Sequence, residues 1–135
     1  MENKSFNIFK NKKIIVTGHT GFKGSWISLI LWLFGAKVVG ISSYDLGPKS
    51  NYNILNIKSK LHREFKIDIN DFEKIKSIFI KTKPDFIFHL AAQPLVRNSY
   101  KDPLSTIHSN AVGTLNLLEI LKNYDGNTIV IFVTS

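Results

Sequence analysis

The sequence of 135 residues contains no cysteine, which excludes a disulfide framework and any metal site built on thiolates. It also lacks a long apolar run: the longest, residues 26–34, is interrupted by Ser28 and is too short to span a bilayer. The lysine-rich N-terminus has no apolar core followed by a small-residue cleavage site, so a signal peptide is not indicated. We therefore expect a cytoplasmic protein of one domain, without membrane association and without a metal.

Acidic residues are scarce, since ten Asp and Glu stand against eighteen Lys and Arg and give a formal net charge of +8. Such a charge is typical of nucleic-acid-binding proteins. Here, however, the lysines are spread along the whole chain without stacking aromatics among them, and Asn and Ile are also abundant, as AT-rich genomes tend to encode. We do not expect nucleic acid as a partner. A modest positive field that attracts an anionic cofactor or a sugar nucleotide fits better.

Predicted strands and helices alternate along the chain. The strands are short apolar runs bounded by charge, glycine or proline, at residues 12–17, 37–41, 64–67, 85–90 and 128–133. The helices are predicted at residues 22–34, about 53–61, 71–81 and from 102 onward, with loops at 42–53 and 93–101. This order predicts an α/β fold, a Rossmann-type doubly wound parallel sheet that is incomplete, with about five strands.

Three helices carry more detailed expectations. The helix at 22–34 is apolar nearly all round, so we expect it to be well covered, with Gly35 ending it. Asn70 and Glu73 resemble a capping box for the helix that follows. Asp102-Pro103 predicts the start of a long helix. The residues of that helix expected to point inward are Ile107, Ala111, Leu115, Leu118 and Leu121.

The stretch "VTGHTGFKGSW" at 16–26 allows two interpretations. A phosphate-binding P-loop needs GxxxxGK, but Lys23 stands where its last glycine should be and Gly24 where its lysine should be. The spacing of Gly18, Gly21 and Gly24 instead fits a dinucleotide fingerprint. There, the first glycine permits a tight turn, the second a close approach of a pyrophosphate, and the third close helix packing. The helix N-terminus behind the loop then offers free N–H donors to the pyrophosphate.

Four ordered motifs resemble the extended short-chain dehydrogenase/reductase family: TGxxGxxG in the glycine loop, "IDIND" at 67–71, "HLAAQ" at 89–93 and "NAVGTLNLLE" at 110–119. More narrowly, "TGHTGFKGSW" and "HLAAQPLVRNSY" resemble its CDP-glucose 4,6-dehydratase branch. The resemblance implies an NAD-dependent lyase acting on a sugar nucleotide. The reaction oxidises C4, loses water across C5 and C6 and returns the hydride to C6. The alternatives are an NAD-dependent sugar-nucleotide epimerase and a non-catalytic dinucleotide-binding module.

The resemblance also implies that residues 1–135 are the N-terminal part of an NAD(P)-binding Rossmann domain. Ser135 stands at the position of the family's catalytic hydroxyl, whereas no Tyr-x-x-x-Lys occurs anywhere in the chain and the C-terminal substrate domain is absent. We therefore expect the chain alone to be inactive. Relatives commonly pair through helices that include the one after Asp102, so we expect a homo-oligomer.

The family's cofactor contacts fall on the glycine loop and the ends of the later strands. The predicted cofactor-binding residues are Gly18, His19, Thr20, Gly21, Phe22, Lys23, Gly24, Ser42, Asp68, Ile69, Leu90, Ala91, Ala92, Gln93 and Asn110. NAD-specific members usually carry an acid where Ser42 and Ser43 stand. Serine tolerates a 2′-phosphate and Lys49 could add charge, which leaves NADP open, but the branch resemblance favours NAD.

Several single residues have an ordinary alternative. Lys23 could hold a phosphate or be a solvated lysine, and His19 could be a ligand or a surface residue. Arg97 could face the substrate, with a guanidinium that forks onto a phosphate, or pair with Asp102. His89 lies in an apolar strand and is expected to be a packed core histidine. Asn110 is expected to keep the active-site backbone and a water in place; as a polar residue inside a helix it needs a partner.

Overall fold

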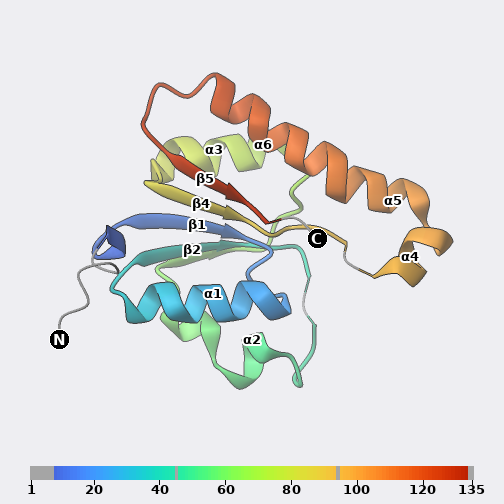
Figure 1. Ribbon diagram of the computed structural model, residues 1–135, viewed down its shortest axis with the longest axis horizontal. Coiled ribbons are helices and arrows are strands. Elements are labelled where there is room, and N and C mark those ends of the chain that lie inside the picture. The colour runs from blue at the N-terminus through green and yellow to red at the C-terminus, as the bar shows by residue number, and fades with distance from the viewer. Residues whose placement is uncertain (1–7, 45, 94, 134–135) are drawn as a thin grey trace.

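The computed structural model describes residues 8–44, 46–93 and 95–133. Its centre is a five-stranded sheet with helices on both faces (Figure 1). The strands are β1 (Lys13–Thr17), β2 (Lys37–Ile41), β3 (Arg63–Phe65), β4 (Phe86–His89) and β5 (Ile129–Phe132). Every pairing is parallel and the order is β3-β2-β1-β4-β5. The predicted Rossmann-type fold is confirmed.

Two apolar layers hold the helices to the sheet. On one face lie α1 (Phe22–Leu33), α2 (Asn51–Ile54) and the 3₁₀ turn η2 (Ile57–Lys60), and α3 (Phe72–Thr82) and α6 (Gly113–Lys122) cover the other (Figure 1). Because β1 is central, its side chains are buried on both sides, with Ile14 and Val16 in the layer of α1 and Ile15 in the layer of α3 and α6. The remaining helices, α4 (Val96–Lys101), α5 (Pro103–Ile107) and the π-helical turn η3 (His108–Val112), lead into α6.

The strand order creates a switch point between β1 and β4. From β1 the chain runs outward to β2 and β3, and then crosses to β4 and β5 on the other side. Successive connections therefore leave the carboxyl ends of β1 and β4 in opposite directions, which opens a crevice there. Ligands of open α/β sheets bind in such a crevice.

The expectation that α1 is well covered is wrong. Phe22 is 71% exposed, Leu33 is 65% exposed, and Trp26 and Ile30 between them are also exposed. The helix meets the sheet mainly through small residues, and its buried positions are Gly24, Ser25, Ser28 and Leu31. A helix that is apolar nearly all round gives no sequence signal for the face that packs, so the side with the small residues, which allows a close approach, could not be recognised.

The long helix after Asp102 is buried on a different side from the one predicted. Its buried residues are Gly113, Leu117 and Ile120. Four of the five residues expected to point inward are exposed, namely Ile107, Ala111, Leu115 and Leu118, and Leu121 is half-buried. The π-helical turn shifts the phase of the periodicity, and a Cβ on Gly113 would lie 2.5 Å from Ile69, so this face packs closest.

Smaller differences concern helix ends. The predicted loop at 93–101 contains α4, which at six residues is too short to show a periodic pattern. The cap of α3 is Asp71, which accepts from the N–H of Lys74, and not Asn70. The single helix expected at 53–61 is divided into α2 and η2 by Asn56, whose φ of 46° is left-handed. In the described part of the chain, no helix is both long and apolar enough to cross a membrane.

Candidate cofactor site

The glycine loop connects β1 to α1 and packs tightly against the backbone that follows β4. Gly18 has a φ of +73°, and a Cβ there would lie 2.9 Å from backbone atoms of Leu90 and Ala91. A Cβ on Gly24 would lie 2.1 Å from the carbonyl oxygen of Gly18, which no side chain permits. Gly18 thus makes the tight turn and Gly24 the close packing that the spacing predicts. At Gly21, by contrast, an added Cβ would meet only the Gly18 carbonyl oxygen, at 3.3 Å.

The N-terminus of α1 is built to accept an anion. Gly21 is its N-cap and offers no side-chain hydrogen bond, and no acidic residue lies in the first turn. The first N–H groups of a helix have no partner within it and carry partial positive charge, so they are free to bind phosphate oxygens. Phe22 and Lys23 are exposed on this turn. The residues present therefore fit a pyrophosphate, and both interpretations of Lys23 remain open.

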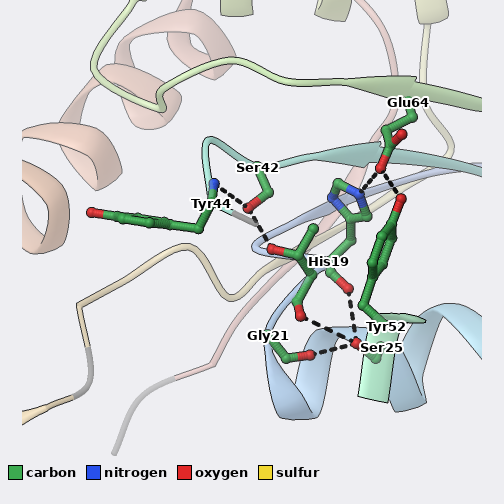
Figure 2. A network of polar contacts seen from close by, with 8 residues as sticks. His19, Gly21, Ser25, Ser42, Tyr44, Tyr52 and Glu64 are labelled. Carbon is green, nitrogen blue, oxygen red and sulfur yellow. Dashed lines mark hydrogen bonds and ion pairs between the residues drawn. The ribbon is translucent and has the colours of Figure 1, made fainter. Parts of the chain in front are cut away.

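Hydrogen bonds hold the loop from two sides (Figure 2). On the helix side, the Ser25 hydroxyl donates to the Gly21 carbonyl oxygen at 2.7 Å. On the sheet side, the hydroxyl oxygens of Thr20 and Ser42 are 2.8 Å apart, and both side chains are buried. Ser42 also accepts from the N–H of Tyr44 at 3.3 Å. The loop conformation is thus fixed by the protein itself.

His19 is turned into the protein and is 1% exposed, so its interpretation as a surface histidine is wrong. Its Nε2 lies 2.9 Å from Oε1 of Glu64, and the same oxygen accepts from the Tyr52 hydroxyl (Figure 2). The ring fills the space above Gly40, where a Cβ would lie 2.6 Å from it. Sequence reasoning missed Glu64 and Tyr52. The available signal was Gly40, because a glycine inside a strand often marks a close approach of another group.

Glu64 is held in its charged form. Partial burial alone would raise the pKa of its carboxyl group, but the hydrogen bonds from Tyr52 and His19 outweigh this and bring the pKa below its usual value. The nearby positive charge of Lys58 acts in the same direction. A charged carboxylate has only acceptors, so both neighbours must donate to it.

On the other side of β1, His89 joins the sheet to α6. Its Nδ1 lies 2.8 Å from Oγ1 of Thr17 and its Nε2 lies 2.9 Å from Oγ1 of Thr114. Since the Thr114 hydroxyl donates to the Asn110 carbonyl oxygen, it must accept from Nε2–H, which leaves Nδ1 to accept from Thr17. Burial lowers the pKa of His89 to about 4, so this ring is neutral at pH 7. The predicted core histidine is confirmed, since the residue is only 5% exposed.

The same Thr17 side chain fixes the end of β4. Its Oγ1 accepts from the N–H of Leu90 at 3.2 Å and of Ala91 at 3.1 Å. Farther on, Asn110 pairs with the backbone of Gln93: Oδ1 accepts from its N–H at 2.6 Å and Nδ2 donates to its carbonyl oxygen at 3.1 Å. Asn110 therefore has the partner that a polar residue inside a helix needs, and it orders the loop that follows β4.

The other residues predicted for the site are less closely connected to the glycine loop and to the end of β4. Asp68 is exposed and accepts from the N–H of Asn70 at 2.9 Å, whereas the side chain of Ile69 packs in the core rather than facing the site. Arg97 is exposed on α4. Within the described residues it forms no ion pair with Asp102, which instead caps α5. Ala92 is exposed beyond β4, and Ser135 lies outside the described residues.

A hollow of about 300 Å³ lies beside the loop, past the end of β2. It is lined by Thr20, Phe22, Leu46, Lys49, Ser50 and Asn51. One wall is therefore the glycine loop and the start of α1, and the other is the segment that leads into α2. Lys49 gives this hollow a positive charge, which suits an anionic ligand.

The sequence pattern of the family described as GDP-mannose 4,6 dehydratase matches residues 15–135. The chain belongs to this family. Its members have the short-chain dehydrogenase/reductase fold, so the resemblance drawn from the glycine loop and the three later motifs is confirmed. The CDP-glucose 4,6-dehydratase of Salmonella typhimurium is 41% identical over 129 residues, which cover 96% of this chain and 36% of that protein.

Solved structures of family relatives show the same architecture. The UDP-glucose 4-epimerase of Thermotoga maritima, solved with UDP-glucose, is 32% identical with a TM-score of 0.76, over 89% of this chain and 37% of that one. The UDP-glucose 4-epimerase of Thermus thermophilus, solved with NAD, is 30% identical with a TM-score of 0.74, over 88% of this chain and 36% of that one. The chain spans little more than a third of the length of these relatives, and both dehydratases and epimerases are among them.

Proposed function

We propose that this chain is the NAD-binding, N-terminal part of a cytoplasmic sugar-nucleotide 4,6-dehydratase that acts on CDP-glucose. The observation that carries the proposal is the uncapped N-terminus of α1 behind the Gly18 turn, at the carboxyl end of the central strands. Such an end binds a pyrophosphate. The dehydratase assignment is supported by the 41% identity to the Salmonella enzyme.

In this proposal the described residues bind the cofactor and the sugar nucleotide and orient them. The residues that carry out the chemical steps lie outside the described part of the chain. The first turn of α1 receives the pyrophosphate, and Lys23 adds positive charge beside it. Asn110 and Thr17 hold the backbone after β4, from Leu90 to Gln93, along the cofactor. Arg97 faces the sugar nucleotide and Ser135 supplies a hydroxyl. The Tyr-x-x-x-Lys pair and a substrate domain come from outside residues 1–135.

Held at the first turn of α1, NAD would supply the hydride acceptor for C4 of the glucosyl unit and, once reduced, the hydride donor for C6. Oxidation at C4 acidifies the C5 proton, which permits loss of water across C5 and C6. We favour NAD over NADP because Ser42 is buried and its hydroxyl is already engaged by Thr20. Lys49 in the neighbouring hollow is the feature that would favour NADP.

The test is turnover of CDP-glucose deuterated at C4 by the purified full-length protein with NAD. The expected product is a 4-keto-6-deoxy sugar nucleotide that carries the deuterium at C6, observed by NMR and mass spectrometry. A C4 epimer formed without loss of water would instead establish the epimerase alternative. NAD binding without turnover of CDP-glucose, UDP-glucose or GDP-mannose would favour the non-catalytic module.

The proposed enzyme is a homo-oligomer that pairs through the helices from α5 to α6. This surface carries an exposed apolar stripe formed by Leu104, Ile107, Leu115 and Leu118. Monomeric proteins rarely leave large apolar patches open to water. A second copy of the chain, with the same stripe, is the partner we propose for it.

A further inference from the structure

The cluster of His19, Tyr52 and Glu64 joins three segments that are far apart in the sequence. His19 belongs to the glycine loop, Tyr52 to α2 and Glu64 to β3 (Figure 2). Glu64 lies 45 residues from His19 and 12 residues from Tyr52, yet one carboxylate oxygen accepts from both side chains. The cluster is a shared anchor and supplies no group to the chemistry proposed above.

The anchor is well suited to hold a fixed geometry. The rings of His19 and Tyr52 are nearly perpendicular, with centroids 5.6 Å apart, and both side chains are buried. Gly40 gives the imidazole its place against β2, since any Cβ there would collide with it. The imidazole is therefore confined by the sheet on one side and by Tyr52 on the other, and can hardly move without breaking its bond to Glu64.

Each end of the cluster is next to a wall of the hollow beside the loop. His19 directly precedes Thr20, which lines the hollow on the loop side, and Tyr52 directly follows Asn51, which lines it on the α2 side. Through its hydrogen bonds to these two side chains, Glu64 therefore connects the two walls of the hollow. Any movement of one wall relative to the other must stretch or break one of these two hydrogen bonds.

We infer that Glu64, acting through His19 and Tyr52, is a positioning residue that sets the spacing between the glycine loop and α2 and thereby the affinity for a dinucleotide. The inference rests on the proposed function for the identity of the ligand. The geometric part stands on the hydrogen bonds and on Gly40 alone.

The test compares variants of the full-length protein by calorimetric titration with NAD. Glu64→Ala removes the shared acceptor and should raise the Kd about tenfold, and Tyr52→Phe, which removes one donor, should raise it about threefold. Glu64→Gln keeps an oxygen that accepts both bonds, so its Kd should lie between those of the wild type and Glu64→Ala. As controls, Tyr124→Phe removes a tyrosine hydroxyl and Glu73→Gln removes a carboxylate outside the cluster. Both variants should bind NAD as the wild type does.

A second measurement needs no cofactor. Amide hydrogen exchange in the NAD-free protein should become faster in Glu64→Ala at Gly21 and at Asn53–Leu55, whose N–H groups are hydrogen-bonded in the loop and in α2, but not in Tyr124→Phe. If Glu64→Ala fails to fold, Tyr52→Phe, which keeps the aromatic packing, decides the question. Wild-type affinity and wild-type exchange in a folded Tyr52→Phe would overturn the inference. If the wild type itself binds no NAD, the proposed function fails, and unchanged exchange in the variants would overturn the positioning role as well.

Discussion

Gly40 lies in β2 beside the imidazole of His19, and the ring occupies the space that a side chain at position 40 would fill. The imidazole fits there only because position 40 has no side chain, since a Cβ would lie 2.6 Å from the ring carbons. The sequence therefore needs a glycine there for a steric reason, although the strand around it consists of valine, isoleucine and lysine.

We predict that Gly40→Ala lowers the free energy of unfolding by about 1–3 kcal/mol, because the methyl group forces the imidazole out of its place. In the double variant with His19→Ala the methyl group finds space, so the combined loss should be smaller than the sum of the two single losses. Urea unfolding of the four proteins measures the coupling. Strictly additive losses would show that the two residues do not meet.

His89 makes stability depend on pH. Its pKa is about 4 in the folded protein and 6.5 in the unfolded chain, so the unfolded chain binds more protons between these values. Stability from the buried neutral ring is complete above about pH 6.5 and is lost as the pH falls toward 4, by roughly 3 kcal/mol in all. Urea unfolding at several pH values should show this decline in the wild type and a shallower one in His89→Gln.

The matched control for this prediction is His108→Gln. His108 is exposed on the π-helical turn. Its removal should leave the pH dependence between pH 4 and 6.5 as it is in the wild type. An equal change of slope in both variants would contradict the assignment of this dependence to His89.

At the scale of elements, α6 shows how an apolar helix can be assigned the wrong inner face. Leucine and isoleucine occur on two sides of it, and only one side meets α3 and the sheet. The side that packs carries Gly113, which admits Ile69 of the segment before α3. Because apolar residues occur on both sides, the close approach that Gly113 permits decides which side packs.

Two leucines of α6 test this face directly. Leu117 is 2% exposed in the core, so Leu117→Ala should cost about 2–5 kcal/mol of unfolding free energy. Leu115 is 62% exposed, so Leu115→Ala should change it by no more than about 0.5 kcal/mol in dilute monomeric protein. Equal losses in urea unfolding would support the face that the periodicity suggested.

For the whole molecule, the stripe of Leu104, Ile107, Leu115 and Leu118 bears on assembly. If two copies pair through it, the double variant Leu115→Arg/Leu118→Arg should weaken self-association by at least about a hundredfold, because two charges per copy would be buried without partners. Analytical ultracentrifugation over a range of protein concentrations measures this. Lys58→Arg, on the other face of the sheet, should associate as the wild type does, and an unchanged double variant would contradict the proposed interface.

The sequence by itself determined the order of strands and helices, the family and the glycine turn. These depend on local features: short apolar runs bounded by glycine and proline, and the spacing of Gly18, Gly21 and Gly24. Such features lie within a few residues of one another, so they can be recognised without knowing what packs against them. Even there, helices as short as α4, and breaks such as the left-handed Asn56, give no periodic signal.

Only the tertiary structure decided which faces of α1 and α6 are covered, and that His19 points inward to Glu64 rather than outward to solvent. It also decided the bonds from Thr17 through His89 and Thr114 that fix the end of β4. These contacts join residues 25 to 72 positions apart. They exist because the parallel strands bring distant segments to one edge of the sheet, where burial makes an unpaired polar group costly and so favours hydrogen bonds between these segments.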